Sequence, residues 1–234
     1  MGLAIDVVTL FPEFFSSPLK ESILKRAGQD RKVSIQIHNL RDYTHDRHQT
    51  ADDRPFGGGA GMVMKPEPIF ECVEKIQKSR PAGRQGWVVV LDPAGEPLTQ
   101  KLAEKLSRKR RLILIAGHYE GVDHRVHEHL ADQEISVGDF ITMGGEAPAL
   151  CLIEAVVRLV PGVFGNKNSL TQESFHSGLL EYPQYTRPRE YRGWSVPEVL
   201  ISGNHPEVEK WRRETAQKIT AGRRPDLVKK KKKP

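Results

Sequence analysis

The alternation of short apolar runs with amphipathic segments along the first two thirds of the chain constrains its fold more than any other feature. Runs with the length and β-branched content of buried strands lie at 4–10, 33–37, 87–92 and 111–117. Segments with apolar side chains at helical spacing lie between them, at 19–28, 65–79 and 98–109. Apolar strands that alternate with such helices form a mostly parallel sheet covered on both faces. The sequence therefore predicts an α/β fold.

The composition of the chain changes in its last third. Residues 161–178 are polar and rich in Gly, Asn and Ser, which is typical of a linker, and residues 206–222 have the pattern of a helix that ends at a glycine. We therefore expect a large domain over 1–162, a linker over 163–176 and a small helical C-terminal domain over 177–234.

The distribution of charge indicates a partner for the C-terminal region. The chain carries a net charge of +6, and its excess of Lys and Arg is concentrated in residues 206–234. A basic segment of this kind can follow the phosphates of a nucleic acid. The terminal run KKKKKP has a simpler alternative, because a lysine run at a chain end is usually a solvated tail.

The composition is not that of a membrane or secreted protein. No stretch approaches about 18 consecutive apolar residues, the length that a membrane-spanning helix needs. The N-terminal segment contains acids where a signal peptide has a basic region followed by an apolar one. We therefore expect a cytoplasmic protein with no membrane partner, in which Cys72 and Cys151 are reduced thiols buried in the core.

Glycine-rich segments adjoin the later strands, at 90–98, 116–123 and 136–149, and a further glycine run lies at 55–62. None has the Gly-x-Gly-x-x-Gly spacing of a dinucleotide-binding turn or the Gly-Lys-Ser/Thr ending of a P-loop. Each segment alone could be an ordinary tight connection. Together the first three predict one ligand pocket, because ligands of open parallel sheets bind outside the carboxyl ends of the strands.

Four longer motifs occur in a fixed order: DDRPFGGGAGMVM, AGHYEGVDHRV, ISVGDFITMGGEAPAL and LLEYPQYTRPREYRG. Together they resemble the bacterial tRNA (guanine-N1)-methyltransferase family, TrmD, of the SPOUT superfamily. The resemblance runs in register from TLFPEFF to about Arg224. It implies that the C-terminal part of the sheet forms a trefoil knot, in which the chain passes through one of its own loops. Such knots are otherwise nearly absent from proteins.

The resemblance also implies an activity. The family transfers a methyl group from S-adenosylmethionine to N1 of the guanosine 3′ of the anticodon, guanosine 37 of tRNA, and Mg²⁺ assists the transfer. It implies a homodimer with shared active sites, in which the knot of one subunit holds the cofactor and the other subunit completes the tRNA site. Two alternatives stay open: a SPOUT methyltransferase that acts on another RNA target, and a catalytically inactive RNA-binding relative.

The catalytic candidates follow from the chemistry of guanine N1, which needs a base for its proton and a cation or donor where negative charge develops at O6. By resemblance, the base falls on Glu173 and the cation on Arg158. The family has aspartate at the first position, and glutamate keeps the carboxylate with one more methylene. Each residue has a simpler explanation: Glu173 lies in a polar linker, and Arg158 follows Glu154 at the spacing of a helical ion pair.

The cofactor-binding residues that the resemblance implies come from the three glycine-rich segments beside the late strands. Most would act through backbone amides and carbonyls, whereas the carboxylate of Glu120 would hold the ribose hydroxyls or attract the positively charged cofactor. His118 stands where the family has arginine. The implied set comprises Leu91, Gly95, Gly117, Tyr119, Glu120, Val137, Gly138, Phe140, Thr142, Gly144, Gly145 and Pro148.

Three polar residues before the first glycine run, Asp52, Asp53 and Arg54, are candidates for reading bases beside the target guanosine. Carboxylates accept hydrogen bonds from guanine N1 and N2. An ordinary turn with two acids is the alternative. The basic and aromatic segment 185–194 suits phosphate contact and base stacking.

Four histidines gather between two of the expected elements, at His118, His124, His127 and His129. They do not form the His-Glu-x-x-His pattern of a zinc site, and several would point to different sides of one helix. We therefore expect no metal-ligating residues.

Overall fold

The computed structural model describes residues 2–79, 85–164 and 173–229. Contacts between residues divide the chain into two compact units, 1–165 and 166–234. The division falls within the range 163–176 that the sequence marks as a linker.

The first unit is built on a five-stranded sheet in the order β2-β1-β6-β5-β7, and every neighbouring pair of strands is parallel. Its strands are β1 Leu3–Thr9, β2 Val33–Asn39, β5 Trp87–Pro97, β6 Arg111–Ala116 and β7 Gln133–Ser136. The prediction of an α/β fold with a mostly parallel sheet is confirmed.

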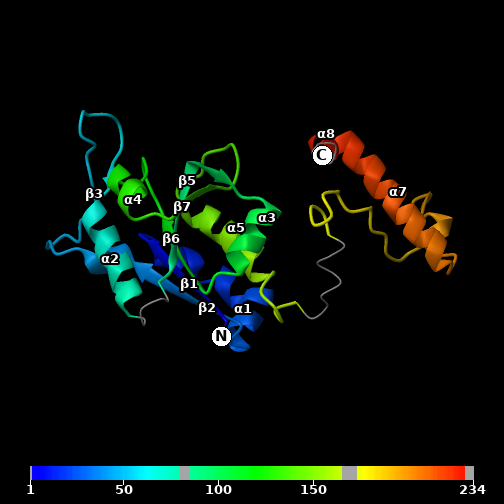
Figure 1. Ribbon diagram of the computed structural model, residues 1–234, viewed down its shortest axis with the longest axis horizontal. Coiled ribbons are helices and arrows are strands. Elements are labelled where there is room, and N and C mark those ends of the chain that lie inside the picture. Colours follow the sequence, from blue (N-terminus) through cyan, green and yellow to red (C-terminus); the bar gives the residue numbers. More distant parts are fainter. Residues whose placement is uncertain (1, 80–84, 165–172, 230–234) are drawn as a thin grey trace. The chain divides into compact units, whose positions relative to one another are not determined.

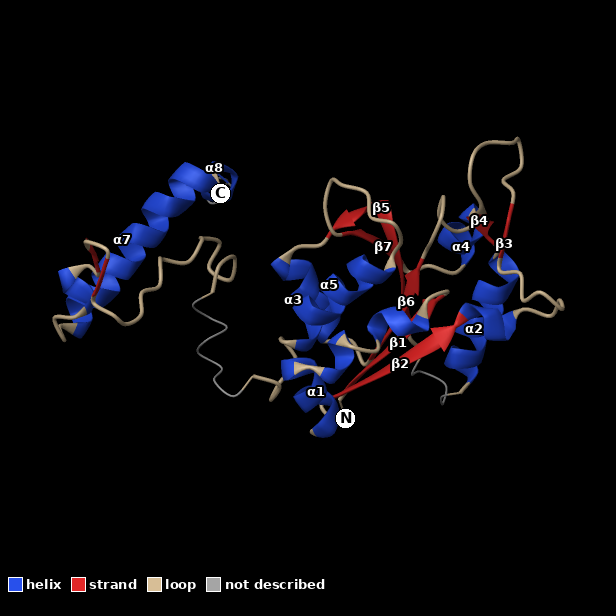
Figure 2. Ribbon diagram, turned by 180° about the vertical axis from the view of Figure 1, so that it is seen from behind, coloured by secondary structure: helices blue, strands red, loops and turns tan. Residues whose placement is uncertain are grey.

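Helices cover both faces of this sheet (Figures 1 and 2). One face packs against α1, α3 and α5, and the other against α2 and α4. The helices are α1 Ser22–Gln29, α2 Pro66–Lys78, α3 Gln100–Ser107, α4 His124–His129 and α5 Glu146–Val157.

The alternation of side chains along the central strand β6 creates two apolar layers. Leu112 and Leu114 lie in the layer with α1, α3 and α5, whereas Ile113 and Ile115 lie in the layer with α2 and α4. All six residues of β6 are buried. A strand buried on both faces reads as a continuous apolar run, which is why the sequence RLILIA is recognisable.

Two short elements, β7 and α4, have weaker sequence signals. Only Ile135 and Ser136 of β7 are buried, and Val126 is the one buried residue of α4. The side chain of Asp123 caps α4 by accepting a hydrogen bond from the backbone N–H of Arg125 at 3.0 Å. Short elements with so few apolar residues lack the periodicity on which prediction depends.

Shorter elements complete the first unit. A two-stranded antiparallel ladder joins β3 to β4, and three single-turn helices flank the strands of the sheet. These elements are β3 Asp52–Asp53, β4 Val63–Met64, η1 Pro12–Phe15, η2 Pro18–Lys20 and η3 Leu40–Tyr43.

The second unit is organised around the long helix α7, His205–Arg223. The side chain of Asn204 caps it, and Thr220 is buried and accepts a hydrogen bond through Oγ1 from the backbone N–H of Leu180 at 2.9 Å. That hydrogen bond attaches the backbone at Leu180 to α7. The remaining elements are β8 Glu190–Tyr191, β9 Trp194–Ser195, η4 Glu198–Leu200 and α8 Pro225–Lys229.

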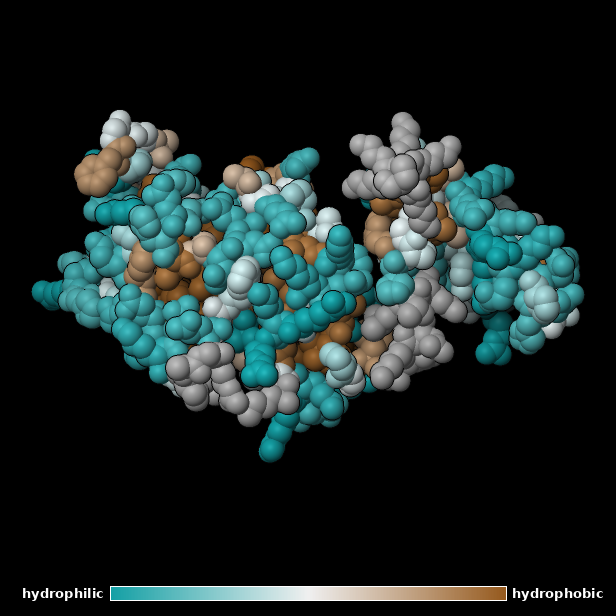
Figure 3. Space-filling model, in the orientation of Figure 1, coloured by the Kyte–Doolittle hydropathy of each residue, from teal (hydrophilic) through white to brown (hydrophobic). Residues whose placement is uncertain are grey.

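The surface in Figure 3 is largely hydrophilic, with hydrophobic side chains visible between the polar ones. No helix within the described ranges has the length and apolar character to span a membrane. Cys72 is buried as expected, but the expectation of a buried Cys151 is wrong, because that residue is exposed on α5. The thiol of Cys72 has its pKa raised to about 12, mainly by burial.

A buried ion pair ties the edge of the sheet to its centre. Asp6 of β1 is 1% exposed, and its carboxylate accepts hydrogen bonds from Arg111 Nε at 2.7 Å and from His38 Nε2 at 2.8 Å. Burial alone raises the pKa of Asp6, but these hydrogen bonds and the positive charges outweigh it, so the pKa lies below its ordinary value.

We expect Asp6→Asn to lower the free energy of unfolding of this unit by about 3–5 kcal/mol, because it leaves Arg111 buried without a counter-charge. The pKa of Asp6 is lowered in the folded state, so its contribution is present above about pH 4 and is lost as the pH falls through the lowered pKa. Urea unfolding at pH 7 measures the change, with the exposed Asp30→Asn as a control. A loss below about 1 kcal/mol would contradict this account of the ion pair.

Candidate functional site

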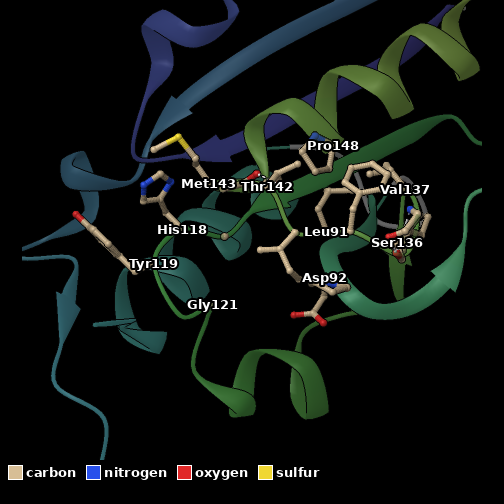
Figure 4. Close-up of a pocket in the computed structure, with 18 of the residues that line it drawn as sticks. Leu91, Asp92, His118, Tyr119, Gly121, Ser136, Val137, Thr142, Met143 and Pro148 are labelled. Carbon is tan, nitrogen blue, oxygen red and sulfur yellow. Dashed lines mark hydrogen bonds between the residues drawn. The ribbon is translucent and has the colours of Figure 1, made fainter. Parts of the chain in front are cut away.

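A cleft of about 230 Å³ opens at the carboxyl ends of β5, β6 and β7. Three turns form its walls: the first interrupts β5, the second follows β6 and the third follows β7. In Figure 4, His118 and Met143 lie at one end of the cleft, Ser136 and Val137 lie toward the other, and Leu91 lies between them. The cleft thus occupies the place where open parallel sheets bind ligands.

The first wall is the bend within β5 at which its pairing with β7 shifts register, between Leu91 and Glu96. The side chain of Asp92 accepts a hydrogen bond from the backbone N–H of Ala94 at 2.8 Å and shapes this turn. Gly95 is not among the residues that line the cleft. A Cβ on Gly95 would overlap the backbone of β7, so glycine is needed there for packing.

The second wall is the turn after β6. Tyr119 has a φ of +58°, and the turn closes with a hydrogen bond from the backbone N–H of Gly121 to the carbonyl of His118 at 3.0 Å. The backbone N–H of Glu120 donates to the carbonyl of Met62 at 3.0 Å. The glycine run at 55–62 therefore ends against this turn, which links it to the cleft.

The third wall is the loop between β7 and α5, the most glycine-rich of the three. Thr142 Oγ1 donates to the carbonyl of Gly144 at 2.8 Å, and the backbone N–H of Gly145 donates to the carbonyl of Gly117 at 2.6 Å. A Cβ on Gly145 would stand 2.8 Å from Cα of Ala116. The loop can lie on the end of β6 only because glycine occupies this position.

The charge of the cleft favours a cationic ligand. Its lining residues include the acids Asp92 and Glu120, and none of the lining residues, all of which the structure describes, is Lys or Arg. Backbone amides and carbonyls of the glycine turns supply most of the other polar groups. Such a site suits a ligand that combines a positive charge with several hydrogen-bonding groups.

Comparison with known proteins identifies the family. A sequence model described as tRNA (Guanine-1)-methyltransferase TrmD matches residues 3–230. The chain belongs to this family. Curated relatives named tRNA (guanine-N(1)-)-methyltransferase include one from Gloeobacter violaceus, which is 54% identical over 97% of this chain and 98% of the relative. Others come from Dictyoglomus turgidum, 53% identical, and Dehalococcoides mccartyi, 51% identical, each over 97% of this chain and 91% of the relative.

In this TrmD-family chain, the cleft gathers the residues that the sequence assigns to the cofactor, with Gly95 as the exception described above. The lining includes Leu91, Gly117, Tyr119, Glu120, Val137, Gly138, Phe140, Thr142, Gly144, Gly145 and Pro148. Their common location agrees with one binding site.

Further lining residues were missed by the sequence reasoning. Each lies within two residues of a residue assigned to the cofactor, so the position of the motifs was the available signal. They are Asp92, Pro93, His118, Gly121, Ile135, Ser136, Ile141 and Met143.

Arg158, the proposed cation, lies at the other end of α5 from the cleft. It is the C-cap of that helix, and its guanidinium Cζ lies 5.3 Å from the ring centroid of Phe164. Pro148 is the last residue of α5 among those that line the cleft, and ten residues of helix, about 15 Å, separate it from Arg158. Arg158 is therefore farther from the cleft of its own chain than an arginine side chain extends.

Glu173, the proposed base, belongs to the second unit and is partly buried. Its carbonyl accepts a hydrogen bond from the backbone N–H of His176 at 3.4 Å. Most of the linker that precedes it, residues 165–172, lies outside the described residues.

The candidate base-reading residues lie beside the second wall of the cleft. Asp52 and Asp53 form β3, which pairs with β4, and the backbone N–H of Met64 in β4 donates to the carbonyl of Gly121 at 3.0 Å. The side chain of Asp53 accepts a hydrogen bond from the backbone N–H of Arg54 at 2.7 Å, and both residues are exposed. They are available to an approaching substrate.

The histidines of the α4 region pair with acids. His127 Nδ1 lies 3.1 Å from a carboxylate oxygen of Glu134, and His124 Nε2 lies 3.6 Å from one of Glu128. Within the described ranges, no three His, Cys, Asp or Glu side chains are grouped so that they could hold a metal ion. None of the described residues is therefore assigned to the Mg²⁺ that the family resemblance implies.

Proposed function

We propose that this protein transfers a methyl group from S-adenosylmethionine to N1 of the guanosine 3′ of the tRNA anticodon. Membership of the TrmD family supports the reaction and the class of substrate. Because tRNA is the proposed substrate, we place the reaction in the cytoplasm.

The charge and shape of the cleft are the observation that carries this proposal. S-adenosylmethionine combines a sulfonium cation with an adenine, a ribose and an amino acid group, and when bound it supplies an electrophilic methyl group. The carboxylates of Asp92 and Glu120 suit the cation or the ribose hydroxyls, and the glycine turns expose backbone groups that can bind the rest.

The proposed chemistry requires two further groups. The carboxylate of Glu173 accepts the proton from guanine N1 as the ring attacks the methyl carbon, and the guanidinium of Arg158 stabilises the negative charge that develops on O6. Asp52, Asp53 and Arg54 are proposed to contact bases beside the target. No step is assigned to Mg²⁺.

The position of Arg158 supports a homodimer with shared active sites. Since about 15 Å of helix separates this residue from Pro148 at the cleft of its own chain, we propose that a second copy brings its Arg158 to that cleft. We propose that Glu173 is supplied in the same way, and that the loops around the cleft form the trefoil knot of the SPOUT superfamily.

The surface of the first unit supports the same dimer. On α5, Ala147 and Cys151 are exposed and Leu150 is partly buried, so an apolar side of the helix lacks a partner within this unit. An apolar groove of about 750 Å³ adjoins the start of α5, and its lining includes Phe14 and Met143, the latter 92% exposed. Apolar surface of this extent is typical of an interface between subunits.

The second unit is proposed to contact tRNA. Its β8–β9 hairpin exposes Tyr191 and Trp194, whose ring centroids lie 6.4 Å apart, and the guanidinium of Arg192 lies 5.2 Å from the ring of Tyr191. A nearby hollow is lined by Arg187 and Arg189. Exposed aromatic rings beside arginines can stack on unpaired bases and contact phosphates.

Methyl transfer to two tRNA transcripts tests the proposed function. Labelled S-adenosylmethionine is supplied with Mg²⁺ and a transcript that has guanosine 3′ of the anticodon, or a matched transcript with adenosine there. We expect label only in the first, recovered as 1-methylguanosine. Label in both transcripts or in another nucleoside would favour a different RNA target. Cofactor binding without any transfer would favour an inactive RNA-binding relative.

A further inference from the structure

His118 separates two hollows of the first unit. Its side chain lines the cleft, and it also lines the apolar groove at the start of α5. Its ring lies 4.6 Å from that of Phe11 and 4.8 Å from that of Tyr119, measured between centroids. Packing on both sides fixes the imidazole in the wall between the hollows, as Figure 4 shows for the cleft side.

The imidazole faces a buried carboxylate. Glu146, in the first turn of α5, is 3% exposed, and its Oε1 accepts a hydrogen bond from Thr9 Oγ1 at 2.8 Å. Its Oε2 lies 3.5 Å from His118 Nδ1, a buried nitrogen with no hydrogen bond. A buried carboxylate is costly unless a positive charge or hydrogen bonds compensate it. The helix N-terminus and Thr9 do part of this, and the imidazole of His118 is the further polar group beside the carboxylate.

This pair lies directly against the third wall of the cleft. A Cβ on Gly144 would overlap both His118 Nδ1 and Glu146 Oε2, so the backbone of Gly144 rests on the two side chains. An isolated β-bridge also joins His118 to Gly144. The next residue, Gly145, donates its backbone N–H to the carbonyl of Gly117. A change in the pair would therefore move the turn that carries two of the proposed cofactor-binding glycines.

We propose that His118, paired with buried Glu146, is a positioning residue that holds the Gly144–Gly145 turn in the shape that binds cofactor. This inference rests on the proposed function, because it takes S-adenosylmethionine as the ligand of the cleft. It gives a role to His118, which stands where the family has arginine.

The inference makes cofactor affinity depend on the pairing of these two side chains. Removing the imidazole leaves the buried carboxylate of Glu146 without this polar neighbour, and a buried polar group that loses a partner is costly. The backbone of Gly144 would also lose one of the two side chains on which it rests, so we expect affinity for the cofactor to fall.

Isothermal titration of the full-length protein with S-adenosylmethionine tests the inference, using the unchanged protein, His118→Leu and His118→Asn. We expect His118→Leu to raise the Kd about tenfold, the lower range for the loss of a hydrogen bond to a charged group. His118→Asn should keep most of the affinity, since its side-chain amide can donate a hydrogen bond to the carboxylate of Glu146 from nearly the position of His118 Nδ1.

The three proteins separate the possible outcomes. Full affinity of a folded His118→Leu protein, or binding by His118→Asn as weak as that by His118→Leu, would overturn the inference alone. No binding by the unchanged protein would overturn the proposed function and the inference with it. Thermal unfolding of each variant shows whether a weak binder is folded.

Discussion

Gly145→Trp is expected to abolish cofactor binding and methyl transfer. A Cβ at this position would stand 2.8 Å from both Cα of Ala116 and the backbone nitrogen of Gly117, so even the smallest side chain meets backbone that cannot turn aside. An indole would also fill part of the cleft. We expect the Kd for S-adenosylmethionine to rise by more than about 100-fold, which corresponds to more than about 2.7 kcal/mol.

The control for this variant is Gly28→Trp, since no atom lies within 4 Å of a Cβ built at Gly28. Circular dichroism and thermal unfolding show whether each protein is folded. Gly145→Ala is a milder second variant, and we expect it to weaken binding because its Cβ meets the same backbone atoms. Unchanged affinity in a folded Gly145→Trp protein would show that the ligand of the cleft lies elsewhere.

Glu173→Gln is expected to lower kcat by about 10²–10⁴-fold, the usual contribution of a general base. The amide has nearly the same shape as the carboxylate but cannot accept the proton of guanine N1. Affinity for the cofactor should stay the same, because the proposed role of Glu173 is confined to the substrate base. Single-turnover methyl transfer with saturating tRNA measures the chemical step.

Two variants are matched to this one. Glu214→Gln removes an exposed acid from α7 in the same unit and should leave kcat unchanged. Glu173→Asp restores a carboxylate and has the residue found in the family, so it should keep most of the activity. A Glu173→Gln protein with full activity would assign the base to another group and remove the main catalytic role proposed for the second unit.

The central sheet could be predicted from the sequence because its strands are buried on both faces. The run RLILIA of β6 contributes alternate side chains to two apolar layers, so it is continuously apolar. The strand at 87–97 was expected over 87–92 only, because the residues after Leu91 are partly or fully exposed. The helix at 66–78 was expected over 65–79 from the helical spacing of its apolar residues. Local periodicity is sufficient where burial dictates every residue.

The cleft could be predicted only in outline. Glycines mark its turns, but the reason for each glycine depends on contacts between residues far apart in the chain. Gly95 packs on β7 and does not line the cleft, whereas Gly145 packs on the end of β6 and does. Local sequence cannot separate these two cases. The pairing of Glu146 with Thr9 and His118 is likewise a product of the fold.

The error at Cys151 has a physical cause. The helix α5 is apolar on nearly every side, so its sequence reads as a fully buried helix. Within the first unit, only one side is covered. A homodimer that covers the other side would account for an apolar sequence on an exposed surface, which is the same arrangement that would bring Arg158 to a cleft.

A mixed dimer of one Gly145→Trp chain and one Glu173→Gln chain tests the shared active site most directly. With a different affinity tag on each chain, the mixed species can be purified away from both parents. If Glu173 serves the cleft of its partner, one of the two sites contains an intact cleft and an intact base. Each parent dimer should then be nearly inactive, while the mixed dimer should have about half the activity of the unchanged enzyme. A mixed dimer no more active than its parents would contradict this account, because each chain would then have to build its active site alone.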